Sequence, residues 1–320
     1  MKTLLLTIAF ALALISNSSA ADKKIIFVAG KPSHRSGEHE HRAGSLLIKD
    51  CLDQMCCHLP MVYRSPRGAE LFGENPKGLS VTSVVYSNGW PTDAKAFDDA
   101  ATIVVYSDGG GGHPLLQEER LKTFGALMEK GVGLVCIHYA VEPTIEKGQR
   151  EFLNWIGGAF EVNWSVNPHW DAEFKSLPTH PITRGVKPFT INDEWYFNMR
   201  FRDGMKGVTP ILTAIPTAST TNRNDGPHEN NPAVRQKVAH GEPQHVAWAT
   251  ERADGGRGFG FSGAHFHRNW GNENFRKLVL NAILWTAKVE VPADGVQSSV
   301  SEAQLESNLD DKTDRKPPTK

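Results

Sequence analysis

The stretch 131–140 (GVGLVCIHYA) lies near the middle of the chain. It contains an unbroken apolar run that stops abruptly at His138. A strand that is apolar at every position is typical of a parallel sheet covered by helices on both faces. The end of such a strand lies at the carboxyl edge of the sheet, where open α/β folds bind their ligands. If a tight turn begins at Tyr139, the ring of His138 points into this cleft. The alternative is a core histidine held by a backbone carbonyl.

Similar runs along the chain predict further strands, and helical spacing of apolar residues predicts helices between them. The alternation predicts an α/β fold with a doubly wound, mostly parallel sheet of the flavodoxin-like type and helices on both faces. We expect one domain over residues 23–288, a flap or poorly ordered stretch over 216–243, and a disordered tail over 289–320. Strands are expected over 24–30, 79–86, 102–106, 132–138, 208–214, 244–250 and 257–263, and helices near 43–54, 94–98, 121–128, 149–156 and 275–285.

The first 20 residues have the pattern of a secretory signal peptide, with a lysine, an apolar run over 4–15 and small residues at 18–20. We therefore expect a periplasmic or secreted protein whose mature chain begins near Ala21. No later stretch is apolar enough for a membrane span. With 35 basic and 36 acidic residues, the formal net charge is −1, which gives no reason to expect a nucleic-acid partner. The disulfide state is left open for Cys51, Cys56 and Cys57.

Ionisable side chains gather in the loops that follow the predicted strands. The loop 31–41 contains His34, His39 and His41, and the glycine loop 109–112 ends at His113. That glycine loop lacks the lysine and hydroxyl residue of a P-loop, so we expect no nucleotide cofactor. Further along the chain, Glu194 lies next to two aromatic residues, and two more histidines follow the last predicted strand, at His265 and His267.

Taken in order, these motifs resemble the ThuA-like family, named for trehalose utilisation, of the class I glutamine amidotransferase-like superfamily. The amino-acid sequence of residues 30–34 resembles that of a secreted branch of the family. The stretches that carry the resemblance are WPTD (90–93), the glycine loop through His113, the strand ending at His138, HPITRG (180–185), EWY (194–196) and HFHRNW (265–270).

The resemblance implies the amidotransferase-like fold and a role in carbohydrate metabolism. Amidotransferases carry a nucleophilic cysteine on the turn after this strand, and His138 occupies that position here. Cys136 lies two residues earlier, inside the strand, so we expect no glutaminase activity. The glycine loop matches the region that supplies oxyanion-hole amides in those relatives.

Two kinds of chemistry fit the histidines. In the first, three side chains ligate a divalent metal such as zinc or manganese and leave a position open for substrate; we assign the metal ligands to His41, His265 and His267. In the second, His138 and His113 act as general acid and base, and Glu194 orients them or the substrate. We assign substrate binding to Gly110, Gly111, His34, Trp195 and Trp270.

The leading hypothesis is an enzyme that acts on a sugar, keto-sugar or glycoside by isomerase, lyase or hydrolase chemistry. The alternative is a carbohydrate-binding protein that uses its tryptophans as stacking platforms, or a scaffold with no catalytic role. The expected partner is a small sugar, and a homodimer is a further alternative to a monomer.

Overall fold

The computed structural model describes residues 23–56 and 81–312 of the 320-residue chain. The expected signal peptide (1–20) and Cys57 lie outside the described residues. Among the helices of the described ranges, none is long and apolar enough to cross a membrane.

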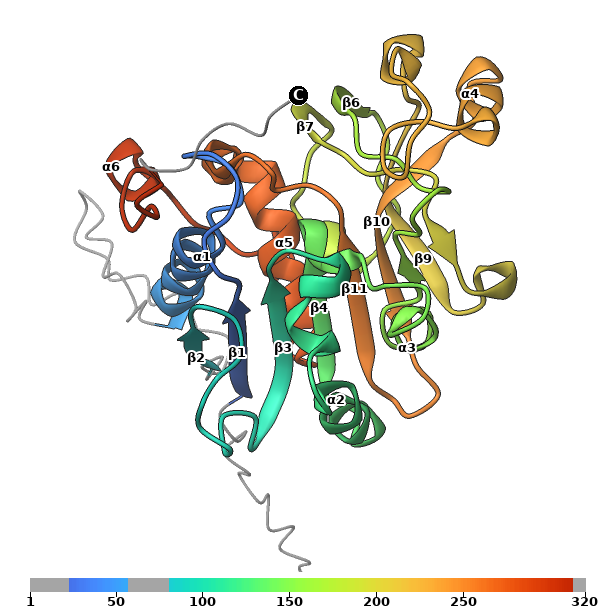
Figure 1. Cartoon of the computed structure of the whole chain (residues 1–320). Helices are drawn as coiled ribbons and strands as arrows, with labels where there is room; N and C mark the ends of the chain where they lie inside the picture. Colours follow the sequence, from blue (N-terminus) through green and yellow to red (C-terminus); the bar gives the residue numbers. More distant parts are fainter. Residues whose placement is uncertain (1–22, 57–80, 313–320) are drawn as a thin grey trace, which may run out of the picture.

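Seven strands form the central sheet (Figure 1): β1 (Lys23–Ala29), β2 (Val81–Tyr86), β3 (Ala100–Tyr106), β4 (Gly133–Ile137), β9 (Val208–Ala214), β10 (Gln244–Glu251) and β11 (Arg257–Phe261). Their order is β2-β1-β3-β4-β11-β10-β9. The first five in this order run parallel, and β10 is antiparallel to both of its neighbours. The expected doubly wound, mostly parallel sheet is confirmed. Its topological switch point lies between β1 and β3, where the chain leaves β1 toward opposite edges.

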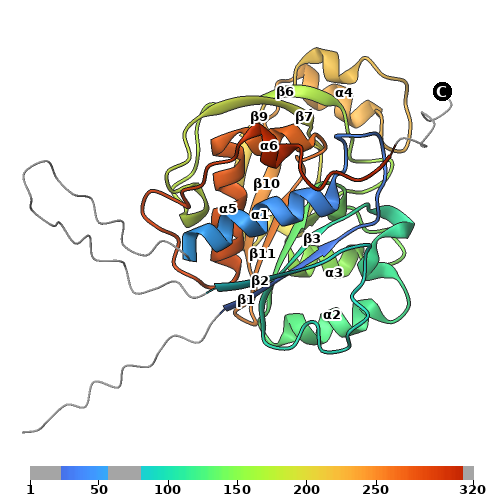
Figure 2. The ribbon, with the colours of Figure 1, turned by 90° about the vertical axis from the view of Figure 1, so that its left-hand side faces the viewer.

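Helices cover both faces of this sheet, as Figure 2 shows. On one face lie α1 (His41–Cys56) and α5 (Glu273–Thr286), and on the other lie α2 (Arg120–Glu129) and α3 (Gln149–Trp155). Alternate residues of β1 reach the two layers, with Phe27 in the α1 and α5 core and Ile26 in the α2 and α3 core. This alternation follows from the two-residue period of a strand. The expected short helix over 94–98 is a series of turns.

Two strand pairs lie outside the central sheet. The pair β6 (His169–Phe174) and β7 (Phe189–Glu194) is antiparallel, and its apolar side chains join the core on the α5 side. A second short pair consists of β5 (Gly158–Ala159) and β8 (Arg200–Phe201). The polar stretch 216–243 is ordered and contains α4 (Pro232–Ala239), whose N-cap is the side chain of Asn231.

The expectation of a disordered tail is wrong for residues 289–312. Val291 and Val296 are buried in the α5 core, and α6 (Glu302–Leu305) packs near α1. At the end of this segment, the Lys312 ammonium forms a fully buried ion pair with Glu40. The apolar residues of the segment are too widely spaced to give a helical or strand period, and each fills a separate gap in the neighbouring helices.

Candidate functional site

His138 lies on a sharp turn at the carboxyl end of β4. Its φ is +58°, a left-handed conformation that is uncommon for a residue other than glycine. A 3₁₀ turn begins at His138 directly after the strand. Strained backbone of this kind is found where a fold aims a side chain into a site. The elbow predicted after the apolar run is therefore present, with an imidazole ring at its tip.

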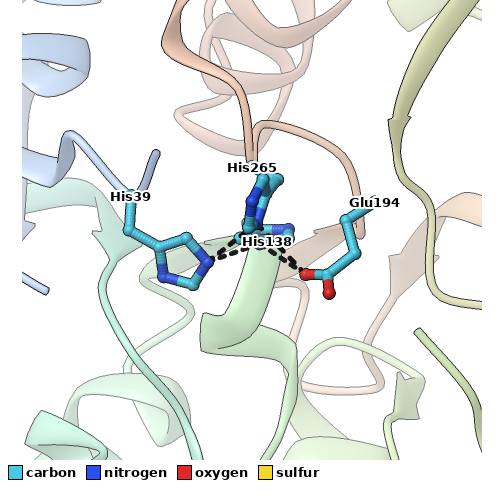
Figure 3. Close-up of side chains that lie close together, drawn as sticks. All are labelled: His39, His138, Glu194 and His265. Carbon is cyan, nitrogen blue, oxygen red and sulfur yellow. Dashed lines mark hydrogen bonds and ion pairs between the residues drawn. The ribbon is translucent and has the colours of Figure 1, made fainter. Parts of the chain in front are cut away.

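Four side chains from distant parts of the chain converge at this elbow (Figure 3): His39, His138, Glu194 and His265. The Nε2 atoms of His39 and His138 are 3.0 Å apart, and His265 Nδ1 lies 3.1 Å from His39 Nε2. Glu194 Oε2 is 3.4 Å from His138 Nε2 and 3.2 Å from His265 Nδ1. The three rings are almost completely buried, and the Glu194 side chain is 13% exposed.

Backbone pairing between two loops brings His39 and His265 together. The His39 amide donates to the His265 carbonyl at 3.0 Å, and Glu38 forms an isolated bridge with Phe266. Buried Asp193 holds the second loop, because its carboxylate accepts bonds from the amides of Ala264 and His265. Asp193 precedes Glu194 at the end of β7, so the carboxylate of Asp193 fixes the loop that lies beside Glu194.

The outer hydrogen bonds of two rings decide which nitrogen faces the centre. His138 Nδ1 donates to the Ser262 carbonyl at 2.8 Å, and a carbonyl can only accept. His39 Nδ1 donates to Asp108 Oδ1 at 2.7 Å. Burial opposes ionisation of Asp108, but the bond from His39 and the neighbouring imidazoles lower its pKa well below its usual range. Both Nε2 atoms therefore direct lone pairs at the centre when the rings are neutral.

This donor set fits a divalent cation. Two lone pairs at 3.0 Å repel unless a proton or a cation lies between them, and burial lowers the pKa of His39 well below its usual value, which disfavours the proton. Donors placed about 2.1 Å from a zinc ion at tetrahedral angles are about 3.4 Å apart. Imidazole and carboxylate ligands suit zinc or manganese. The Asp108–His39 bond is the outer support that metal-binding histidines generally have.

The carboxylate of the set is held in its ionised form. Burial alone would raise the pKa of Glu194, but three neighbouring imidazoles, those of His138, His169 and His265, lower it well below its usual range. Tyr196 adds a polar hydroxyl 3.2 Å from His138 Nε2. Burial raises the pKa of Tyr196 well above its usual range, so the hydroxyl keeps its proton at neutral pH.

A pocket of about 660 Å³ lies beside the cluster, at the switch point between β1 and β3. Gly30 after β1 and Asp108 after β3 form part of its wall, together with Trp90 and Arg120. Asp108 therefore lines the pocket and also accepts the hydrogen bond from His39. A cavity of this size is typical of a small-molecule site.

Of the predicted site residues, His138, Glu194 and His265 belong to the cluster, and His34 lies at its rim, stacked on His39 with ring centroids 3.5 Å apart. His41 and His267 do not belong to it. His41 Nδ1 donates to the Lys31 carbonyl, and its Nε2 lies 3.6 Å from Asp108 Oδ1, the oxygen that also accepts from His39. The C-terminal segment near Leu305 covers His267.

His113 is a structural residue in this fold. Its Nδ1 accepts the amide hydrogen of Leu115, and its Nε2 donates to the Ala140 carbonyl, so neither nitrogen is left for acid–base chemistry. The ring is fully buried, and burial lowers its pKa to about 4. The predicted catalytic role of His113 therefore does not agree with its contacts.

We expect His113→Ala to lower the free energy of unfolding by about 2–4 kcal/mol, because it removes two buried hydrogen bonds and leaves a cavity. Thermal unfolding measures this loss. The same variant should keep the metal content of the wild type, and loss of metal in a folded His113→Ala protein would contradict the structural role.

The residues assigned to sugar stacking are in the core. Trp195 and Trp270 are both fully buried, so neither ring offers a face to a ligand. The Gly110 amide donates to the Glu142 carbonyl, so it is not a free donor for an oxyanion. At Gly111 the space where a Cβ would stand is open. The hypothesis of tryptophan stacking platforms, which rests on Trp164, Trp170, Trp195 and Trp270, thus loses three of its four rings, because Trp170 is buried as well.

Sequence reasoning missed His39, Asp108 and Tyr196 as members of the site. Each had a positional signal, because Asp108 follows β3 as His138 follows β4, and Tyr196 lies two residues after Glu194. His39 shares its loop with two other histidines, and only the pairing of this loop with residues 264–267 selects it.

The fold is the α/β fold of the class I glutamine amidotransferase-like proteins, and His138 lies on the elbow after β4. Cys136 is buried inside β4, and burial raises the pKa of its thiol well above its usual value. The sequence model of the ThuA family, described as trehalose utilisation, matches residues 66–286. The chain belongs to the ThuA family.

Two solved structures resemble the chain. A protein described as ThuA-like from Bacteroides uniformis ATCC 8492 matches with a TM-score of 0.52 and 13% identity, over 88% of this chain and 95% of that one. A second, from Parabacteroides merdae ATCC 43184, has a TM-score of 0.47 and 14% identity, over 88% and 94% of the two chains. The first likeness supports the fold. No curated protein matches the sequence.

Proposed function

We propose that this protein is a metal-dependent enzyme that acts on a sugar or keto-sugar. The observation that carries the proposal is the convergence of three imidazole nitrogens and one carboxylate oxygen, with outer hydrogen bonds that turn the lone pairs of His39 and His138 inward. The family's association with trehalose utilisation favours a glucose-containing substrate. Residues 1–20, read as a signal peptide, favour an exported enzyme.

The chain's own residues supply binding and orientation. His39, His138, Glu194 and His265 would hold a divalent ion, which would polarise a sugar carbonyl or hydroxyl and stabilise developing negative charge. The Tyr196 hydroxyl, beside His138, is placed to donate a hydrogen bond to the same sugar oxygen. Asp108 keeps the His39 ring oriented and forms a wall of the adjacent pocket, where the remainder of the sugar is held. Proton transfer next to a carbonyl is the reaction class that this arrangement favours.

The test compares chelated and metal-loaded wild-type protein on glucose-based glycosides and their keto derivatives, with product analysis. We expect turnover only in the metal-loaded form, with at least about a 100-fold difference in rate. Glu194→Gln, which removes a ligand, should stay inactive after metal is added back. Equal activity of the chelated and loaded forms, or no product from any sugar offered, would overturn the proposal.

A further inference from the structure

Glu142 is a buried carboxylate outside the metal cluster. It is 2% exposed and directly follows the 3₁₀ turn that begins at His138. Its Oε1 accepts a hydrogen bond from His228 Nε2 at 2.9 Å, whereas its Oε2 is buried without a hydrogen-bond partner in the described structure. An unpartnered buried carboxylate oxygen is costly. This atom is therefore suited to a ligand hydroxyl or a proton of the substrate.

Tyr139 separates this carboxylate from the metal cluster. The Tyr139 ring lies 6.1 Å from the His39 ring on one side, and its hydroxyl lies beside Gly110 together with Glu142 Oε1 on the other. A Cβ added to Gly110 would be 3.6 Å from the Tyr139 hydroxyl and 3.8 Å from Glu142 Oε1. Both distances are ordinary van der Waals contacts, so the Tyr139 hydroxyl and the Glu142 carboxylate lie side by side next to Gly110. The Glu142 carboxylate also lies near enough to Glu194 and Tyr196 of the site to interact electrostatically with both.

His228 connects Glu142 to water. Its side chain is 30% exposed and stacks on Phe160, with ring centroids 5.2 Å apart. It lies in the long stretch between β9 and β10 for which the sequence predicts either a functional flap or a poorly ordered segment. The His228 carbonyl accepts the amide hydrogen of Asn167, whose side chain donates to Glu194 Oε1 at 3.1 Å. The segment carrying His228 is thus fastened to a residue of the cluster.

Burial and the bond between the two side chains both shift the pKa values of this pair. Burial raises the pKa of Glu142, although the bond from His228 opposes it. The same bond raises the pKa of His228 above its usual value. The other ionisable groups that act on the pair are Glu194, Glu229 and the protonated hydroxyls of Tyr139 and Tyr196.

We propose that Glu142 Oε2 takes and returns the substrate proton in the sugar reaction, and that His228 exchanges that proton with water. This inference rests on the proposed function. The Glu142 carboxylate removes a proton from the carbon next to the sugar carbonyl; the pair of that C–H bond forms a C=C bond, and the π pair of the carbonyl moves onto its oxygen to give an enolate. In an isomerisation, the former carbonyl carbon takes the proton back from Glu142, and the hydroxyl proton of the neighbouring carbon passes to the enolate oxygen. In an elimination, the C–O bond one carbon further along breaks, its electron pair leaves with the oxygen, and that oxygen takes the proton. No electrons enter or leave the sugar, so no oxidant is needed.

The experiment measures kcat, KM, sugar binding and metal content for metal-loaded wild type, Glu142→Gln and His228→Gln, with Glu146→Gln as a matched exposed control on the same connection. We expect Glu142→Gln to keep its metal and to bind the sugar within about threefold, and to lose kcat by about 100-fold or more. His228→Gln should move the acid limb of the kcat profile to higher pH, because the ionised carboxylate loses its cationic partner.

The outcomes separate the two proposals. If the wild type turns over a sugar and Glu142→Gln does so at a similar kcat, the role of Glu142 is overturned and the metal-dependent function stands. Loss of metal or of sugar binding in Glu142→Gln, with an unchanged pH profile in His228→Gln, would make the pair a structural support and also overturn the inference. If the wild type turns over no sugar, both proposals fall.

Discussion

Removal of one cluster ligand, in His138→Ala, is expected to abolish tight binding of zinc or manganese. The wild type, loaded with the metal and desalted, should retain about one equivalent by elemental analysis. Changing a residue that only supports a ligand already costs about 10–100-fold in metal affinity, so loss of a ligand should cost at least about 100-fold. The reason is geometric, because His138 Nε2 lies within 3.4 Å of both His39 Nε2 and Glu194 Oε2.

His240→Ala is the control, since His240 is exposed and does not belong to the cluster. It should bind metal as the wild type does. A folded His138→Ala protein with unchanged affinity for zinc or manganese would mean that the four side chains of the cluster do not form one metal site. A wild type that retains no metal after loading would remove the basis of the proposed function.

The second large effect is expected from Lys312→Met. The Lys312 ammonium pairs with Glu40 at 3.0 Å, and both side chains are fully buried. It also donates to backbone carbonyls of the loop that carries His39, including those of Arg35 and Glu38. Removing one partner of a buried ion pair leaves an uncompensated charge and typically costs about 3–5 kcal/mol. For a domain of this size, we expect Tm to fall by roughly 10 °C.

Lys122→Met, at an exposed position of α2, should change the free energy of unfolding by no more than about 0.5 kcal/mol. The double variant Lys312→Met with Glu40→Gln should recover part of the loss, because it removes the unpaired charge. If Lys312→Met melts at the wild-type temperature, the C-terminal segment does not stabilise the His39 loop.

Local patterns were sufficient for the sheet and for part of the site. The apolar run before His138 predicts a buried parallel strand. The carboxyl ends of parallel strands all lie at the same edge of the sheet, so the position of His138 follows. The same reasoning places Glu194 and His265 near that edge. These predictions depend on strand ends, which the sequence marks well.

Local patterns could not choose among the histidines of one loop. His39 has a positive φ of 46° and is selected by pairing with the His265 backbone, a contact between segments 226 residues apart. His41, two residues later, begins α1 and bonds to the Lys31 carbonyl instead. His113 was misjudged because its role depends on two backbone bonds that only the folded chain provides. The packed tail was missed because isolated apolar residues carry no period.

The long separation between His39 and His265 also fixes the order of assembly. A chain synthesised as far as the turn after β4 carries two of the four donors, His39 and His138, on segments that the later strands have not yet brought together. Under the proposed function, the complete metal site exists only in the finished fold, so bound metal would add its binding free energy to the stability of that fold. The supply of metal would then set both how much of the protein is active and how much of it resists unfolding.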